Sequence, residues 1–116
     1  MYNLQLTEEQ AQLVARACEF YARIRIGQFN EIVWECLDHS LPTEDYCSRR
    51  DLAEIALLQA RSSIFPDLHG MGHSYGIGKF EDADKSYDVY QVLRKAMGDR
   101  RDPYSHYQLP VCTKIG

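Results

Sequence analysis

The hydrophobic residues of the first quarter of the chain recur at the spacing of an amphipathic helix. Apolar positions follow one another every three or four residues between positions 13 and 24. Just before them, Thr7 and Gln10 have the spacing of a capping box, in which each side chain accepts a hydrogen bond from the backbone N–H of the other residue. Gly27 stands just after the last apolar positions and suits the residue that ends a helix. The first predicted helix therefore starts after Thr7 and ends at Gly27.

The clearest amphipathic pattern belongs to a second predicted helix, over residues 28–39. Its apolar positions fall at i, i+3, i+4, i+7 and i+8, and they are Phe29, Ile32, Val33, Cys36 and Leu37. Its polar face is acidic, and Pro42 follows shortly after its end.

Two more helices are predicted in the second half of the chain. The third starts at Thr43 or Ser48, and Pro66 stops it. The apolar positions of this third helix indicate its inner face, which consists of Leu52, Ile55 and Ala56 with either Gln59 or Ser63. The fourth predicted helix begins at Glu81 or Asp82 and ends near residue 97.

Four predicted helices without a strong strand pattern favour a small all-α fold, a four-helix domain spanning residues 1–116. A glycine-rich loop connects the third helix to the fourth. The tail over residues 99–116 is predicted to be irregular, with at most a short strand near Val111. The apolar helix faces are wider than one small domain needs, which favours a homo-oligomer with closed symmetry.

Composition and charge narrow the classes of partner. The chain has 116 residues and a formal net charge of −4. A protein that binds duplex nucleic acid needs many cations to neutralise phosphates, so this charge disfavours that class and leaves room for a small anion held by a few arginines. The sequence shows no signal peptide, no apolar run long enough to cross a membrane and no C-x-x-C pair among its four cysteines. These features predict a cytoplasmic protein with no membrane partner.

The loop between the third and fourth predicted helices is the first candidate for a binding site. Four glycines fall in the nine residues 70–78, and Ser74, Tyr75 and Lys79 lie among or beside them. Such a loop lets backbone N–H groups approach a ligand closely. It does not match a phosphate-binding P-loop, because Phe80 stands where that motif needs Ser or Thr. An ordinary structural turn that needs its glycines is the open alternative.

Tyrosines and arginines form a second candidate cluster. Tyr87, Tyr90 and Arg94 lie near one face of the fourth predicted helix, and Tyr21 and Arg25 are four residues apart on the first. A nucleobase can stack on tyrosine while arginine binds phosphate. The alternative is that these tyrosines are core residues whose hydroxyl groups reach water.

Two pairs of carboxylates suggest a third kind of chemistry. Glu31 and Glu35 are four residues apart on one helix face, and so are Asp84 and Asp88. All-α nucleotide pyrophosphohydrolases place Mg²⁺ between such pairs, because this cation prefers carboxylate oxygens and water. The complete motif of those enzymes is missing, and solvated surface acids are the alternative. No metal or cofactor is therefore expected.

Several short segments carry a resemblance to a known group of proteins. They read LTEEQA over residues 6–11, YARI over 21–24, GQFNE over 27–31, SYGI over 74–77, DAD over 82–84 and YDVYQVLR over 87–94. With these segments the chain resembles small uncharacterised accessory proteins of tailed phages and prophages, over about residues 5–97. The resemblance implies a counter-defence factor, and some factors of this class are oligomers that sequester nucleotide immune signals.

The sequence leads to one principal hypothesis and two alternatives. The principal hypothesis is a phage-encoded protein that sequesters a cyclic nucleotide or an ADP-ribose derivative in the host cytoplasm, without catalysis. Its expected ligand-binding residues are Ser74, Tyr75, Gly76, Lys79, Tyr87, Arg94 and Arg25. The first alternative is a protein that inhibits a host defence or CRISPR protein by direct contact. The second is a Mg²⁺-dependent nucleotide hydrolase that uses Glu31, Glu35, Asp84 and Asp88.

Overall fold

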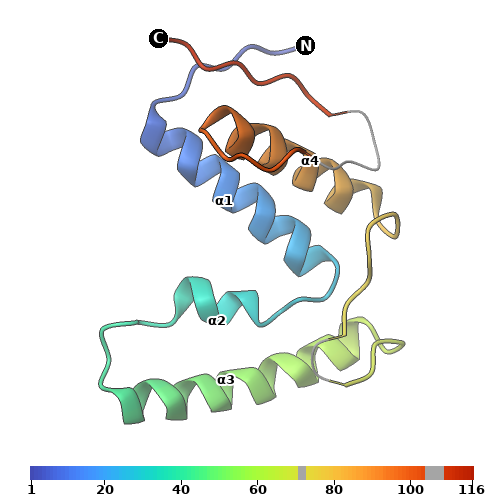
Figure 1. Ribbon diagram of the computed structural model, residues 1–116. Helices are drawn as coiled ribbons and strands as arrows, with labels where there is room; N and C mark the ends of the chain where they lie inside the picture. Colours follow the sequence, from blue (N-terminus) through green and yellow to red (C-terminus); the bar gives the residue numbers. More distant parts are fainter. Residues whose placement is uncertain (71–72, 104–108) are drawn as a thin grey trace. The chain divides into compact units, whose positions relative to one another are not determined.

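The computed structural model describes residues 1–70, 73–103 and 109–116 (Figure 1). In these ranges the chain forms four α-helices and no strand: α1 (Glu8–Arg25), α2 (Glu31–Cys36), α3 (Thr43–Ile64) and α4 (Glu81–Ala96). The predicted all-α class is confirmed, whereas the short strand near Val111 is not formed. Residues 71–72 of the predicted loop and 104–108 of the predicted tail lie outside the described residues. No described helix is long and apolar enough to span a membrane.

Both ends of α1 follow the local chemistry of the sequence. The Thr7 N–H donates to Gln10 Oε1 at 3.0 Å and the Gln10 N–H donates to Thr7 Oγ1 at 3.2 Å, so the predicted capping box is confirmed. At the other end, the N–H of Gly27 donates to the carbonyl of Ile24 at 3.0 Å and the next N–H donates to the carbonyl of Arg23 at 2.9 Å. Gly27 has a φ of +96°, which completes the Schellman arrangement that ends the helix.

The helix α2 is shorter than predicted at both ends. Before it, the N–H of Glu31 donates to the carbonyl three residues earlier, so residues 28–30 form a tight turn rather than α-helix. After it, Leu37 is extended, and the Asp38 side chain accepts hydrogen bonds from the N–H and the hydroxyl of Ser40 at 2.9 and 2.7 Å. This Asx turn offers the backbone an alternative to helix and explains why the helical pattern stops early.

The helix α3 presents the opposite face to the one predicted. It starts at Thr43, but Leu52 and Ile55 are 68 % and 59 % exposed, and Ala56 is exposed as well. The inner face consists instead of Tyr46, Cys47, Arg50, Ala53, Glu54, Leu57, Leu58 and Arg61. The prediction failed because α3 carries two apolar stripes at helical spacing, and periodicity alone does not decide which of them a short neighbour such as α2 covers.

The chain divides into two compact units. Unit 1 comprises residues 1–22 and 77–116, and unit 2 comprises residues 23–76. In unit 1, Ala15 of α1 and Ala83 of α4 are buried, and the hydroxyl of Ser86 donates to the carbonyl of Cys18 at 2.7 Å. The first and last segments of the chain run side by side in this unit (Figure 1), where both line a cavity of about 510 Å³.

Unit 2 contains the last turn of α1, the helices α2 and α3, and the loop that follows them. Its α2 packs on α3. The ring of Phe65 lies between those of Phe29 and Tyr75, with centroid distances of 6.0 and 5.3 Å. Val33 and Leu68 are buried. These contacts fix the start of the α3–α4 loop against the connection between α1 and α2.

Candidate functional site

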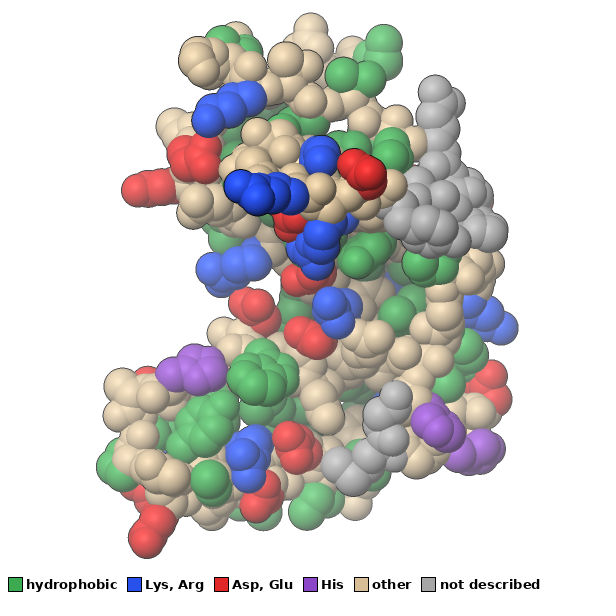
Figure 2. All heavy atoms as spheres, in the orientation of Figure 1, with side chains coloured by type: hydrophobic (Ala, Val, Ile, Leu, Met, Phe, Trp, Pro, Cys, Tyr) green, Lys and Arg blue, Asp and Glu red, His purple; other side chains and the backbone are tan. Residues whose placement is uncertain are grey.

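The most conspicuous surface of unit 2 is an aromatic cleft between α2 and α3. Its volume is about 470 Å³, and it is lined by Val33, Trp34, Tyr46, Arg50 and Glu54. Trp34 is 66 % exposed, although a ring of that size is usually mostly buried. Over α2 and the N-terminal half of α3, Figure 2 shows hydrophobic, basic and acidic side chains next to one another. The cleft therefore combines an accessible aromatic surface with both signs of charge.

The local backbone holds this cleft in place. His39, beyond the end of α2, donates from its ring Nε2 to the carbonyl of Trp34 at 3.0 Å. Its ring also packs on that of Tyr46, with a centroid distance of 5.6 Å. The early end of α2 thus brings His39 back onto α3 and fixes Tyr46 beside the exposed indole.

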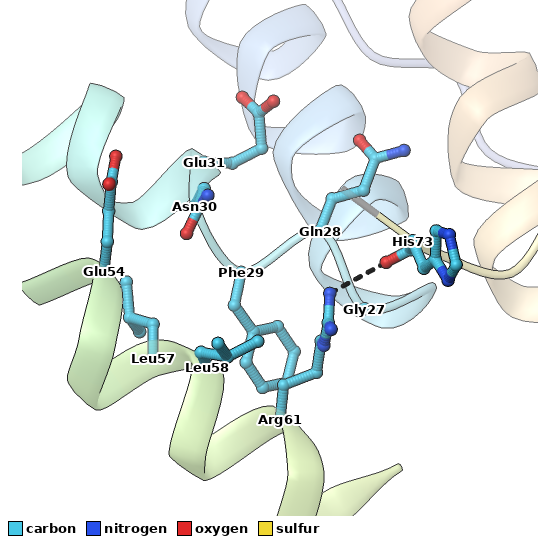
Figure 3. Close-up of a pocket in the computed structure, with 10 residues that line it drawn as sticks. All are labelled: Gly27, Gln28, Phe29, Asn30, Glu31, Glu54, Leu57, Leu58, Arg61 and His73. Atoms are coloured by element: carbon cyan, nitrogen blue, oxygen red, sulfur yellow. Dashed lines mark hydrogen bonds between the residues drawn. The ribbon is translucent and has the colours of Figure 1, made fainter. Parts of the chain in front are cut away.

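Unit 2 has a second cavity, with a volume of about 220 Å³ (Figure 3). Residues 27–31 form one wall, and Glu54, Leu57, Leu58 and Arg61 of α3 form the other. Glu54 lines both the cavity and the cleft. We call the two together the α2–α3 groove.

Arg61 closes the inner end of this groove and fastens the following loop. It is 5 % exposed, and its Nη1 donates to the carbonyl of His73 at 2.9 Å while its Nη2 donates to the carbonyl of Gly70. Its Nε is buried and has no hydrogen-bond partner among the residues that the structure describes. Buried donors of this kind are commonly satisfied by a bound water molecule.

The charges of the groove nearly balance. Glu31 pairs with Arg23 at 3.6 Å, and Arg50 donates from Nε and Nη2 to Asp51, at 3.2 Å each. The pair formed by Arg50 is exposed and therefore weak, so its guanidinium can exchange Asp51 for a ligand anion. Glu31 and Glu54 disfavour a polyphosphate inside the smaller cavity, whereas a group with both donors and acceptors suits it.

Four of the residues predicted to bind a ligand lie in unit 2. Ser74 accepts a hydrogen bond from Gln28 Nε2 at 3.2 Å. The N–H of Tyr75 donates to the carbonyl of Ile26 at 2.9 Å, and its hydroxyl donates to Asp67. The pKa of Tyr75 is raised, mainly by this hydrogen bond to Asp67 and to a smaller extent by burial. Gly76 follows in the same loop, and Arg25 lies in the last turn of α1.

These contacts give the predicted loop residues a role in holding the loop. Gln28 lines the smaller cavity, and Ser74 is bound to it, so Ser74 supports the cavity wall. Tyr75 is tied down at its backbone, its ring and its hydroxyl. Whether either residue contacts a ligand stays a prediction.

The other three predicted residues, Lys79, Tyr87 and Arg94, lie in unit 1. The rings of Tyr87 and Tyr90 are 5.3 Å apart, and the guanidinium of Arg94 lies 5.9 Å from the ring centre of Tyr90. Arg94 also pairs with Asp99 at 3.2 Å and donates to the carbonyl of Arg101 at 3.1 Å. Arg94 thus fastens the chain that follows α4.

The four carboxylates of the hydrolase alternative divide between the units, with Glu31 and Glu35 in unit 2 and Asp84 and Asp88 in unit 1. Asp84 accepts a hydrogen bond from the N–H of Gly78 at 2.9 Å, and Asp88 is buried. Across the residues that the structure describes, no group of three or more His, Cys, Asp or Glu side chains is placed to hold a metal ion.

The sequence reasoning missed the residues of the aromatic cleft. Trp34 falls three residues after Glu31 and four before Asp38, on the polar side of the second predicted helix. A lone tryptophan on a polar helix face was the available signal. Tyr46 and Arg50 could not be found in this way, because their position depends on which face of α3 packs inward.

Comparison of the chain with protein-family models, curated protein sequences and solved structures finds no match. The α2–α3 groove is therefore interpreted from its own residues.

Proposed function

We propose that this protein binds a small nucleotide in the α2–α3 groove and sequesters it without catalysis, as a phage-encoded counter-defence protein acting in the host cytoplasm. The observation that carries the proposal is the exposed indole of Trp34 beside Tyr46 and Arg50. Stacking of one nucleobase on an aromatic side chain contributes about 1–3 kcal/mol. An accessible aromatic ring beside a guanidinium suits a ligand that carries a flat ring and a phosphate.

The two parts of the groove suit different parts of such a ligand. Arg50 lies at the wide aromatic cleft, where its guanidinium supports binding of a phosphate. The smaller cavity is lined by the amide of Asn30 and the carboxylate of Glu54, while the amide of Gln28 is held by Arg23 and Ser74. This mixture of donors and acceptors suits the edge of a base or a ribose.

A contact with a host defence or CRISPR protein is the second candidate function. Trp, Tyr and Arg are the residues that dominate the binding energy of protein interfaces, and all three occur in the cleft. The nucleotide is favoured because the smaller cavity, which shares Glu54 with the cleft, is too small for a segment of folded protein.

The single tryptophan of the chain provides the test, because Trp34 alone reports on the cleft. Cyclic mononucleotides, cyclic dinucleotides and ADP-ribose are titrated into the protein, and indole fluorescence is recorded with excitation near 300 nm to limit nucleotide absorbance. We expect saturable quenching by at least one ligand at micromolar concentration. Calorimetry on Trp34→Ala should then show affinity reduced by about tenfold or more, which corresponds to 1.4 kcal/mol.

The control variant is Tyr2→Ala, which removes a fully exposed aromatic ring from unit 1 and should bind as the wild type does. A folded protein that gives neither quenching nor heat with any nucleotide would exclude the proposal and favour the protein partner. Binding that survives Trp34→Ala unchanged would place the nucleotide outside the cleft.

A further inference from the structure

Glu54 is the residue that the two parts of the α2–α3 groove share. It lines the aromatic cleft together with Trp34, and it also lines the smaller cavity. Its side chain is half-buried and extends from α3 towards α2 (Figure 3). A flat ring that stacks on the indole of Trp34 can therefore present one of its edges to this carboxylate.

The carboxylate of Glu54 is not engaged by its neighbours. Arg50 precedes it by four residues on α3, a spacing that allows an ion pair. Arg50 instead donates from Nε and Nη2 to Asp51, at 3.2 Å each. Among the residues that the structure describes, no group donates a hydrogen bond to Glu54 or forms an ion pair with it. Both carboxylate oxygens are therefore available to a ligand.

We propose that Glu54 selects guanine, so that the ligand of the groove is a guanine nucleotide. This inference rests on the proposed nucleotide binding and adds the identity of the base. An ionised carboxylate accepts hydrogen bonds and donates none, so it binds best to two donors that lie side by side. Guanine carries such a pair, N1–H and the N2 amino group. Adenine and cytosine each place a ring acceptor beside their amino group, and uracil places its N–H between two carbonyl oxygens, so the carboxylate repels part of each edge.

Asn30 and Arg50 suit other parts of the same ligand. The side-chain amide of Asn30 also lines the smaller cavity, and its N–H groups can donate to O6 of guanine, which lies next to N1–H. Among the described residues that line the cleft, Arg50 is the only cation. A nucleotide with a single phosphate therefore suits the cleft better than one with several, and a cyclic mononucleotide is the simplest probe.

Calorimetry with cyclic GMP, cyclic AMP and cyclic IMP tests the selection, because the three nucleotides differ only in the base. The protein should bind cyclic GMP about tenfold or more tightly than cyclic AMP, the discrimination expected of one bidentate pair. Cyclic IMP keeps N1–H but lacks the N2 amino group, so its affinity should lie between the two. Equal affinities for cyclic GMP and cyclic AMP, or binding of ADP-ribose alone, would overturn the guanine assignment and leave the proposed nucleotide binding intact. A folded protein that binds no nucleotide at all would refute both.

The variant Glu54→Gln shows whether this side chain makes the selection. Glutamine keeps the shape but replaces one acceptor oxygen by an NH₂ group, which would oppose the amino group of guanine. The variant should bind cyclic GMP about tenfold more weakly than the wild type, and it should bind cyclic AMP at least as tightly, because a glutamine amide pairs well with adenine.

The pattern of loss separates base selection from other roles of Glu54. A purely structural role, or a contact with the ribose, would weaken cyclic GMP and cyclic AMP equally, and that result would refute the inference. The matched control is Glu44→Gln, which removes an exposed carboxylate of the same helix that lines neither part of the groove. This control should keep the preference of the wild type for cyclic GMP.

Discussion

The turn at Gly27 allows a quantitative prediction, because Gly98 provides a matched control. Both glycines end a helix with positive φ, +96° and +109° respectively. Their surroundings differ: a Cβ added at Gly27 would lie 2.7 Å from Cδ1 of Leu68, whereas one added at Gly98 would meet nothing within 4 Å. The same substitution therefore separates backbone strain from crowding.

Gly98→Ala should lower the free energy of unfolding by about 1–2 kcal/mol, the cost of a left-handed conformation for an L-residue. Gly27→Ala should cost that amount plus about 1–2 kcal/mol for overpacking, because Leu68 is buried but its terminal carbon can shift in part. Urea unfolding followed by far-ultraviolet circular dichroism measures both values. In the double variant with Leu68→Ala, the two changes should sum to less than their separate costs.

Equal losses for Gly27→Ala and Gly98→Ala, within about 0.5 kcal/mol, would refute the reasoning. They would mean that backbone strain alone accounts for the loss and that Leu68 does not crowd Gly27. A double variant whose losses are strictly additive would point to the same conclusion.

Two further predictions concern the ends of helices. Thr7→Ala should lower stability by about 1 kcal/mol in a thermal melt, because it removes the hydroxyl that accepts the Gln10 N–H, and Thr7→Ser should retain most of the stability. Asp99→Asn should be less stable than the wild type at pH 7. The side chain and the N–H of Arg101 donate hydrogen bonds to Asp99, and together with the nearby charge of Arg94 they hold the pKa of Asp99 well below its usual range. A carboxylate with a depressed pKa stabilises the fold at pH values above its unfolded pKa of about 3.9. The difference in stability between the wild type and the variant should therefore narrow as the pH falls below about 4. A difference in stability that stays constant down to about pH 2 would contradict this prediction.

The sequence predicted well those parts of the fold that depend on local chemistry. The start of α1 follows from Thr7 and Gln10, and its end follows from Gly27, because each cap involves residues a few positions apart. The early end of α2 is also local, but the Asx turn of Asp38 outweighed an apolar pattern that continued to Leu37. The orientation of α3 is not determined by residues close to it in the sequence. The helix has two apolar stripes, and tertiary contacts selected the one that contains Leu57 and Leu58.

The candidate site shows the same division. Ser74 and Tyr75 were found because glycine-rich loops are recognisable in a sequence, and the structure shows both residues fastened to neighbouring backbone and side chains. The α2–α3 groove joins Trp34 to Tyr46 and Arg50 across a connection between two helices. Which residues line the groove depends on the rotation of α3 about its own axis. The spacing of residues in the sequence does not predict that rotation.

In α3 the charged Arg61 is buried whereas Leu52 and Ile55 are exposed, which inverts the usual relation between hydrophobicity and mutational tolerance. In a scan scored only by the abundance of folded protein, Arg61 should be intolerant of substitution and Leu52 and Ile55 should accept polar residues. Engineering for solubility normally replaces exposed hydrophobic residues first. In α3 that practice would change Leu52 and Ile55, which contribute least to the fold, and would leave its buried arginine untouched.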